Sequence, residues 1–307
     1  MMNLFQQKIA TVLIGFFCLT HFPLAHSAPA DWFNEQSALF SAHKQFLEGQ
    51  TLKGFSTSIE VLQSTTDNNV IQNIDKLMGV VISDSCGRDL STIVIPKWLT
   101  SLSVQRMVIQ SPGRLHHRLM VQFDSKKEIS SLSFIKWPDE ELLINPSIRK
   151  IPTQDESVTQ YIYGSDSLNN RVKNGLYKLI ITADDKEKTQ WETWVVLSTP
   201  KTEMTVSWLG KEKWKTTQTG LLNSNCPLPE MSVGIYDHQD NEYIKLWEES
   251  YEEKFPKSLP STNVLPGSYI LSVSFNHKRF QGPISIQEIQ AITKVINFDG
   301  LENVERN

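Results

Sequence analysis

The sequence predicts a mostly β protein in which a small cap of α-helical hairpins precedes two tandem antiparallel, immunoglobulin-like β-sandwiches. Three observations lead to this fold. Apolar residues recur at helical spacing over residues 31–83. From Val104 onward they alternate with polar residues, as in half-buried strands. The stretch NGLYKLIITADD at 174–185 also has a counterpart, PGSYILSVSFNH, at 266–277. We expect a signal peptide at 1–27, a helical cap domain at 28–102, sandwiches at 103–200 and 201–299, and a tail at 300–307.

The first 27 residues have the organisation of a secretory signal peptide. Lys8 gives a positive start, and IATVLIGFFCLTHF at 9–22 is an apolar run of the length such signals need, too short for a good membrane span. Ala25 and Ser27 place small residues at the −3 and −1 positions of a cut after Ser27, with a cut after Ala30 as the alternative. We expect a periplasmic protein whose mature chain has no membrane span.

Charge and cysteine content narrow the class of protein. Removing the signal takes one basic residue, Lys8, from 30 basic and 34 acidic residues, which leaves a formal charge of −5. This charge argues against nucleic acid or an anionic membrane as partner. Cys86 and Cys226 remain, and in an oxidising compartment such a pair most often forms one disulfide. Two separate buried thiols are the alternative. We expect no cofactor, because no histidines stand at ligand spacing beside the cysteines.

The expected helices and strands follow from the spacing of apolar residues along the chain. Apolar stripes run through 31–50, 51–63 and 71–81, and their small loops favour antiparallel helical hairpins. From Val104 onward, apolar and polar residues alternate in seven short segments. These predict the strands of the first sandwich: VQRMVIQ, HRLMVQF, SSLSFIKW, ELLINPSI, VTQYIYG, LYKLIIT and WETWVVL. Four strands are expected in the second: EMTVSWLG, MSVGIYDH, SYILSVSF and ISIQEIQAITKVINF. The segment YIKLWEESYEEKF at 243–255 fits either a helix or a strand followed by a turn.

The repeated stretch is interpreted as structural. Gly175 and Gly267 are each followed two residues later by a tyrosine, Tyr177 and Tyr269, and then by alternating apolar residues. Glycine tolerates the positive φ of a tight turn. The tyrosine ring can bury itself at the start of a core strand while its hydroxyl reaches nearby backbone. We expect the motif to mark the same late strand in each sandwich.

Few residues are candidates for chemistry. The Asp139, Glu140 and Glu141 cluster could supply paired carboxylates for glycoside hydrolysis, but a turn of exposed charge is the better interpretation. Oxygen-rich YDHQDNE could bind calcium, although a solvated turn is favoured. Its candidate ligands are Asp237, Asp240 and Glu242. No nucleophile elbow, phosphate loop or dinucleotide fingerprint occurs in the sequence. The sequence therefore supplies no catalytic residue and favours a protein that is not an enzyme.

Four tryptophans are the candidate binding residues. Exposed aromatic rings beside polar residues suit stacking on sugars or contact with a protein partner. Trp191 and Trp194 lie three positions apart on one predicted strand, so their side chains point to opposite faces. At least one of them is therefore off the core face or at an edge. Filling of the core between sheets is the alternative for most of them. The candidates are Trp191, Trp194, Trp208 and Trp214.

The signal, the helical opening and the long β region with SFIKWPDEELLINP and GLYKLIITADDKEKTQWETWVVL resemble an uncharacterised family of exported proteins from marine gammaproteobacteria, a domain of unknown function. The resemblance implies a periplasmic accessory role beside envelope-sensing histidine kinases. We therefore expect a non-enzymatic protein that binds a partner of the cell envelope, such as a sensor-kinase ectodomain. A glycan- or peptidoglycan-binding module that uses the tryptophans is the first alternative, and a cell-wall hydrolase is the second.

Overall fold

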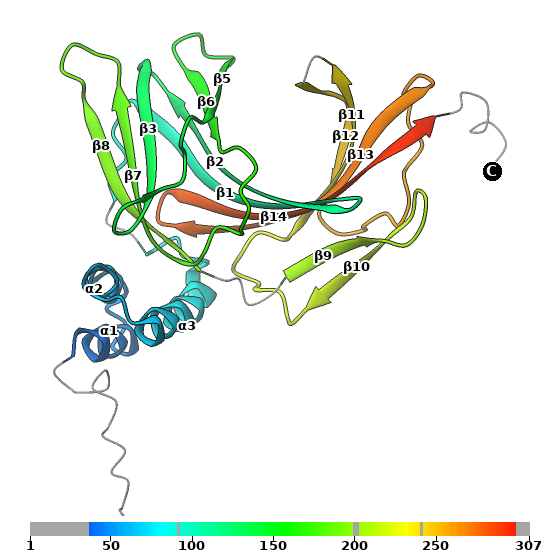
Figure 1. Ribbon diagram of the computed structural model, residues 1–307. Helices are drawn as coiled ribbons and strands as arrows, with labels where there is room; N and C mark the ends of the chain where they lie inside the picture. Colours follow the sequence, from blue (N-terminus) through cyan, green and yellow to red (C-terminus); the bar gives the residue numbers. More distant parts are fainter. Residues whose placement is uncertain (1–36, 91–92, 199–202, 240–241, 299–307) are drawn as a thin grey trace, which may run out of the picture.

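The computed structural model describes residues 37–90, 93–198, 203–239 and 242–298. It confirms a mostly β protein with three helices near the N-terminus (Figure 1). The predicted signal peptide and tail lie outside the described residues. The helices are α1 (Ala38–Leu47), α2 (Thr51–Ser64) and α3 (Asn68–Ser85). The strands are β1 (Leu99–Ser111), β2 (Arg114–Ser125), β3 (Ile129–Lys136), β4 (Glu140–Glu141), β5 (Ser147–Pro152), β6 (Thr159–Gly164), β7 (Gly175–Ala183), β8 (Gln190–Leu197), β9 (Glu203–Trp208), β10 (Trp214–Thr219), β11 (Glu230–Gln239), β12 (Glu242–Tyr251), β13 (Gly267–Gln281) and β14 (Ile284–Phe298).

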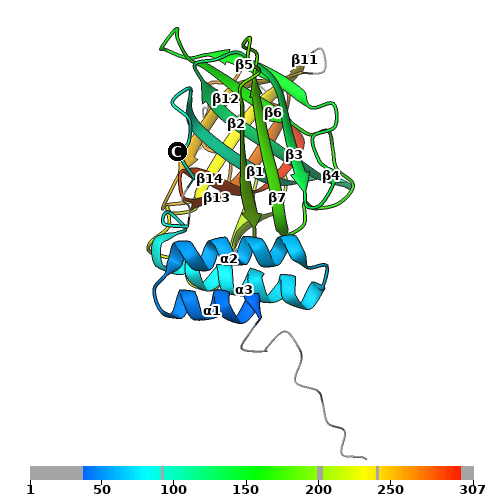
Figure 2. The ribbon, with the colours of Figure 1, turned by 90° about the vertical axis from the view of Figure 1, so that its left-hand side faces the viewer.

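The helices form a layer across one end of the strands (Figure 2). Before α3, Asp67 Oδ1 accepts a hydrogen bond from Asn69 N at 2.8 Å, which satisfies one free N–H of the first turn. The buried faces of the helices pack against Leu176 of β7 and Val196 of β8. The predicted three-helix opening is therefore confirmed. None of the described helices is long and apolar enough to cross a membrane.

Eight strands form one curled sheet, in the order β12-β11-β13-β14-β1-β2-β6-β5 (Figure 1). Within it β14 runs parallel to β1, with Val104 opposite Ile286 and Ile109 opposite Ala291. Strands from both sides of the predicted boundary at 200/201 therefore share a sheet, and two tandem immunoglobulin-like sandwiches are not confirmed. Alternation predicts which face of a strand is buried, but it does not identify a neighbour distant in sequence.

One face of β14 contributes to two hydrophobic cores. Ile284 and Ile286 near its start belong to the first core, whereas Ile292 and Ile296 near its end belong to the second. Residues an even number of positions apart on a strand share a face, so all four side chains lie on the same side of the sheet. The opposite face of the sheet lies outside both cores.

The first core lies between the eight-stranded sheet and a four-stranded sheet of order β4-β3-β7-β8. Phe123 stacks on Tyr161 with 5.5 Å between ring centroids, and Phe134 stacks on Tyr177 at 5.0 Å. Six of the seven strands predicted here are present, whereas most of the fourth, ELLINPSI at 141–148, is a loop between β4 and β5. The positive φ of Asn145 interrupts an extended chain there. This half of the molecule is therefore a pair of sheets packed around a core.

The second core is covered by the β9–β10 hairpin (Figure 1). Trp214 of β10 is fully buried, and its Nε1 donates to Pro256 O at 2.7 Å. The ambiguous segment at 243–255 forms strand β12 as far as Tyr251, so the helical alternative is wrong. Strand β10 was not predicted, because only one of its six residues, Trp214, is buried and its sequence shows no clear alternation.

Long polar side chains of β13 and β14 cap the edges of the covering strands. Gln290 accepts from Val206 N at 2.8 Å and donates to Val206 O at 3.0 Å, as a neighbouring strand would. Gln281 accepts from Val196 N at 2.8 Å and donates to Trp194 O at 2.6 Å. These bonds satisfy buried backbone groups at the edges of β8 and β9 and fix both covering layers to the shared sheet.

A disulfide joins Cys86 and Cys226, with 5.0 Å between their Cα atoms and a sequence separation of 140. Cys86 follows the last turn of α3, and Cys226 lies in the loop between β10 and β11. The predicted pairing is confirmed. It fastens the helical layer to a loop of the second half of the molecule.

Candidate binding groove

The eight-stranded sheet is curled, so its two ends rise on either side of β1 and β14 (Figure 1). A hollow lies on the concave face of the sheet. We call this hollow, of about 840 Å³, the concave groove. It is lined by residues of six strands, of the turn between β1 and β2, and of the loop that follows β6. They are Ile109, Ser111, Pro112, His116, Arg118, Asp166, Ser167, Tyr236, Tyr243, Ile270, Ser272, Thr293, Lys294 and Val295.

Strand register brings the residues of the groove together. Tyr236 lies opposite Ile270, and Ile270 lies opposite Val295, so three strands place these side chains in one row. Thr293, two residues from Val295, shares its face and bonds Ser111 Oγ at 2.8 Å between the hydroxyl oxygens. The floor therefore alternates rows of aliphatic and hydroxyl side chains.

The β2 wall of the groove carries a histidine and an arginine. His116 Nδ1 lies 2.8 Å from Ser167 Oγ, and Arg118 Nε donates to Ser165 O at 3.4 Å. Both contacts reach the loop after β6, where Asp166 is exposed. This wall offers a cation, a carboxylate and an imidazole to a ligand, so it can recognise polar groups of either sign.

The opposite wall is aromatic. Burial raises the pKa of Tyr236 to about 12, with the Glu248 carboxylate as a further cause. Its hydroxyl stays protonated at neutral pH and donates to Glu248 Oε1 at 3.3 Å. A Cβ at Gly234 would lie 2.8 Å from this ring, so glycine is needed beneath it. Tyr243, by contrast, is 63% exposed, and its ring remains available to a ligand.

The groove is suited to non-covalent binding. Val295 is 66% exposed on its floor, so an apolar surface is presented between hydroxyl groups. Among the described residues, no three His, Cys, Asp or Glu side chains are placed to hold a metal ion. Asp166 is the one carboxylate among the residues that line the groove. Shape and hydrogen bonding, rather than a cluster of reactive groups, characterise this surface.

The predicted tryptophans lie away from the groove. Trp191 and Trp194 point to opposite faces of β8, as expected: the first packs on the first core and the second on the helical cluster. Trp208 packs on the second core, with Lys294 Nζ 3.9 Å from the centre of its ring. Trp214 is fully buried, so it fills the core and is not exposed to a ligand.

The repeated glycine–tyrosine motif has different surroundings in its two copies. Gly175 begins β7 and Gly267 begins β13. Tyr177 is fully buried, and its hydroxyl donates to Lys173 O at 2.6 Å, the backbone contact expected of such a tyrosine. Tyr269 is partly exposed and packs near Phe298, with 6.0 Å between ring centroids. The two strands also belong to different sheets, so they do not occupy equivalent positions.

The acidic candidates have structural partners or lie outside the described residues. Asp237 is on β11 and accepts a hydrogen bond from Gln239. Asp240 and the side chain of Glu242, the other proposed calcium ligands, lie outside the described residues. Glu141 accepts from Phe134 N and Leu143 N, both at 3.0 Å, and so shapes its own turn.

The groove was not predicted because its residues are scattered over strands far apart in sequence. The sequence feature that could have indicated it is the composition of the strand face that does not point into a core. In HRLMVQF and SYILSVSF, the residues between the core positions are a mixture of arginine, methionine, glutamine, isoleucine and serine rather than charged residues alone. Such a face suits a recessed surface better than a fully solvated one.

Among curated proteins, none matches the chain. A family described as "Protein of unknown function (DUF2861)" matches residues 32–297, most of the chain. The chain therefore belongs to this family.

Proposed function

We propose that this protein is an exported, non-enzymatic accessory protein that binds a protein partner of the cell envelope in its concave groove. Export is supported by the signal-like segment at 1–27 and by the bond between Cys86 and Cys226. Disulfides persist mainly in oxidising compartments such as the periplasm. The resemblance noted from the sequence suggests that the partner is the ectodomain of a sensor kinase.

The observation that carries the proposal is the composition of the groove. Exposed Tyr243 and Val295 stand beside the hydroxyls of Ser272 and Thr293 and the charge of Arg118. Protein interfaces combine aromatic and aliphatic anchors with arginine and with hydrogen-bonding groups in this way. A volume of about 840 Å³ suits an extended segment or loop of the partner better than a flat domain surface.

Site-directed photo-crosslinking in living cells tests this proposal. A photoreactive phenylalanine analogue would replace Tyr243 on the groove and, as the matched control, Lys186, which is exposed in the turn between β7 and β8. We expect one discrete adduct from position 243 and none from position 186. Equal adducts from both positions, or none from position 243, would contradict the proposal.

A glycan is the second candidate, and the exposed ring of Tyr243 favours it. Aromatic rings flanked by hydroxyl groups stack well on sugars. A sacculus-binding assay with Tyr243→Ala separates the two candidates: loss of sacculus binding supports the glycan, whereas unchanged sacculus binding with loss of the protein adduct supports the protein partner.

A further inference from the structure

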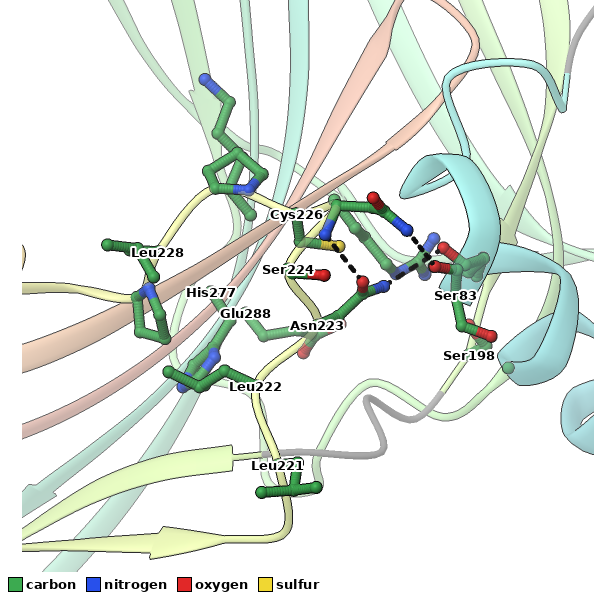
Figure 3. Close-up of a pocket in the computed structure, with 17 residues that line it drawn as sticks. Ser83, Ser198, Leu221, Leu222, Asn223, Ser224, Cys226, Leu228, His277 and Glu288 are labelled. Atoms are coloured by element: carbon green, nitrogen blue, oxygen red, sulfur yellow. Dashed lines mark hydrogen bonds between the residues drawn. The ribbon is translucent and has the colours of Figure 1, made fainter.

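A second pocket lies apart from the concave groove, where α3, the disulfide loop, β13 and β14 meet. It has a volume of about 410 Å³ and shares no lining residue with the groove. Figure 3 shows Leu222 and Leu228 beside His277, while Asn223 points toward Ser83 of α3. The pocket therefore has an apolar side and a polar side.

Three charged residues are buried beside this pocket. Among the described residues, the buried charged side chains are Arg106, Arg279 and Glu288, of which Arg279 and Glu288 line the pocket. Two buried guanidinium groups thus lie near one buried carboxylate, and Arg171 Nη2 lies 3.9 Å from the same carboxylate. Because a buried charge is costly unless it is paired, the distribution of hydrogen bonds decides which arginine is the less well compensated.

Arg106 takes up the charge of Glu288. Its Nε donates to Glu288 Oε1 at 2.7 Å, and its Nη2 donates to the same oxygen and to Ser198 O at 2.8 Å. Its Nη1 donates to Val172 O at 3.2 Å and to Asn174 Oδ1 at 3.0 Å. Arg106 and Glu288 therefore form a satisfied, charge-neutral pair.

Arg279 makes fewer polar contacts than Arg106, although the Glu288 and Asp75 carboxylates favour its charged form. It is 8% exposed, and its buried Nε has no hydrogen-bond partner among the described residues. Its Nη2 makes one long bond, to Val196 O at 3.3 Å. Burial lowers the pKa of Arg279 to about 10, so the group is still charged at neutral pH. A pocket wall with a buried cation that makes few polar contacts favours an anionic ligand.

We propose that this pocket binds an amphiphilic monocarboxylate, with the carboxylate on Arg279 and the apolar body along Leu222 and Leu228. Glu288 also lines the pocket and repels a dianion more strongly than a monoanion, which favours a carboxylate over a phosphate. The apolar side of the pocket then covers the hydrocarbon part of the ligand.

The pocket is largely formed before a ligand arrives. Asn225 Nδ2 donates to Ser83 O at 3.0 Å, and Arg88 Nη1 donates to Asn225 O at 3.0 Å, so the loop is bonded to the end of α3. The disulfide at Cys226 holds the same loop covalently. Preorganisation of this kind lowers the entropic cost of binding.

Calorimetric titration with octanoate tests the proposal on the disulfide-bonded chain from residue 28 onward. Loss of a charge-assisted hydrogen bond should weaken octanoate binding by about tenfold or more in Arg279→Met. Arg279→Lys should recover part of the loss because it retains the charge. Lys254→Met, which removes an exposed charge outside the pocket, is the matched control and should change the affinity by less than about twofold. The uncharged 1-octanol should bind wild type and Arg279→Met alike.

Several outcomes would overturn the inference. They are no binding of octanoate to the wild type, equal octanoate affinity in the wild type and Arg279→Met, and tighter binding of inorganic phosphate than of octanoate. Arg279→Met is expected to fold, because an apolar side chain in place of a buried charge with few polar contacts is not a destabilising change. Crosslinking from Tyr243 reports on the groove alone, so the two proposals can fail separately.

Discussion

The first core is enclosed between two sheets, whereas the second is covered by a two-stranded hairpin. In the first half, the covering sheet is itself buried on its far side by the helices, as Val196 of β8 and Leu176 of β7 show. In the second half, the hairpin that buries Trp214 has an exposed outer face, as Lys215 and Thr217 show. The same sheet therefore supports two cores with unequal protection.

This difference explains why one sequence motif has two outcomes. Tyr177 begins a strand inside the doubly covered layer, so its ring is fully buried and its hydroxyl needs the Lys173 carbonyl. Tyr269 begins a strand of the shared sheet and remains partly exposed. A local pattern can predict that a strand begins, but the layers packed around that strand decide how much a residue contributes to stability.

The largest expected effect separates these two tyrosines. Tyr177→Ala should lower the free energy of unfolding by about 3–5 kcal/mol, as for other fully buried aromatic residues. Tyr269→Ala should cost about 1 kcal/mol, because its ring is partly exposed already. Urea denaturation of both variants gives the comparison, with Tyr177→Phe as a control that removes only the hydroxyl. Equal losses for the two Ala variants would remove the distinction between the halves.

The second prediction concerns the covalent link between the halves. Replacing both Cys86 and Cys226 by Ser should lower the free energy of unfolding by about 2–4 kcal/mol, because the bond restricts the unfolded chain. Wild type measured in reductant should match the double variant. Unchanged stability in both experiments would mean that the bond adds nothing to the contacts that already join α3 to the loop.

The third prediction compares the two glutamine clamps. Gln281→Leu and Gln290→Leu each leave a backbone N–H and a C=O of a covering strand without their partner, which should cost about 1–3 kcal/mol. The losses should be similar, since each glutamine bonds one N–H and one C=O of a covering strand. Hydrogen exchange at Val206 and Val196 amides reports each clamp separately, and unaltered exchange at both amides would argue against this role.

The smallest effect is a pH dependence confined to the first half. Lys127 and Thr189 bond the Asp185 carboxylate in the turn between β7 and β8, and they hold its pKa well below its usual range. Its stabilising contribution is complete above the unfolded-state pKa of about 3.9 and is lost as the pH falls from there toward the folded-state pKa. Asp185→Asn should therefore be less stable than wild type at pH 7, with a smaller difference at pH 3. A difference of equal size at both pH values would contradict this account.

Periodicity predicted the elements well because it reports a local property. The three helices and most strands follow from which residues of a segment are apolar, as in VQRMVIQ and LYKLIIT. The pairing of β14 with β1 depends on a distant partner that shares no local signal. The cysteine pairing could be predicted because only two cysteines remain after residue 27.

The candidate sites were less predictable than the fold. Tryptophan was expected to mark a binding surface, yet Trp214 is the kind of large side chain that a small second core needs to fill its volume. Tyr243 and Arg118 were not singled out, because their relation appears only when the sheet curls. Arg279 was also missed, since its burial without a hydrogen-bond partner for Nε depends on residues distant in sequence.

The central claim is that one continuous sheet holds both walls of the groove in a fixed relation. Double electron–electron resonance between spin labels at Arg149 on β5 and Lys245 on β12, both exposed, measures the distance across the groove directly. The account predicts a single narrow distance distribution in the chain without ligand, because strand pairing through β1 and β14 connects the two walls. A broad distribution, as expected of two domains joined by a flexible linker, would contradict it.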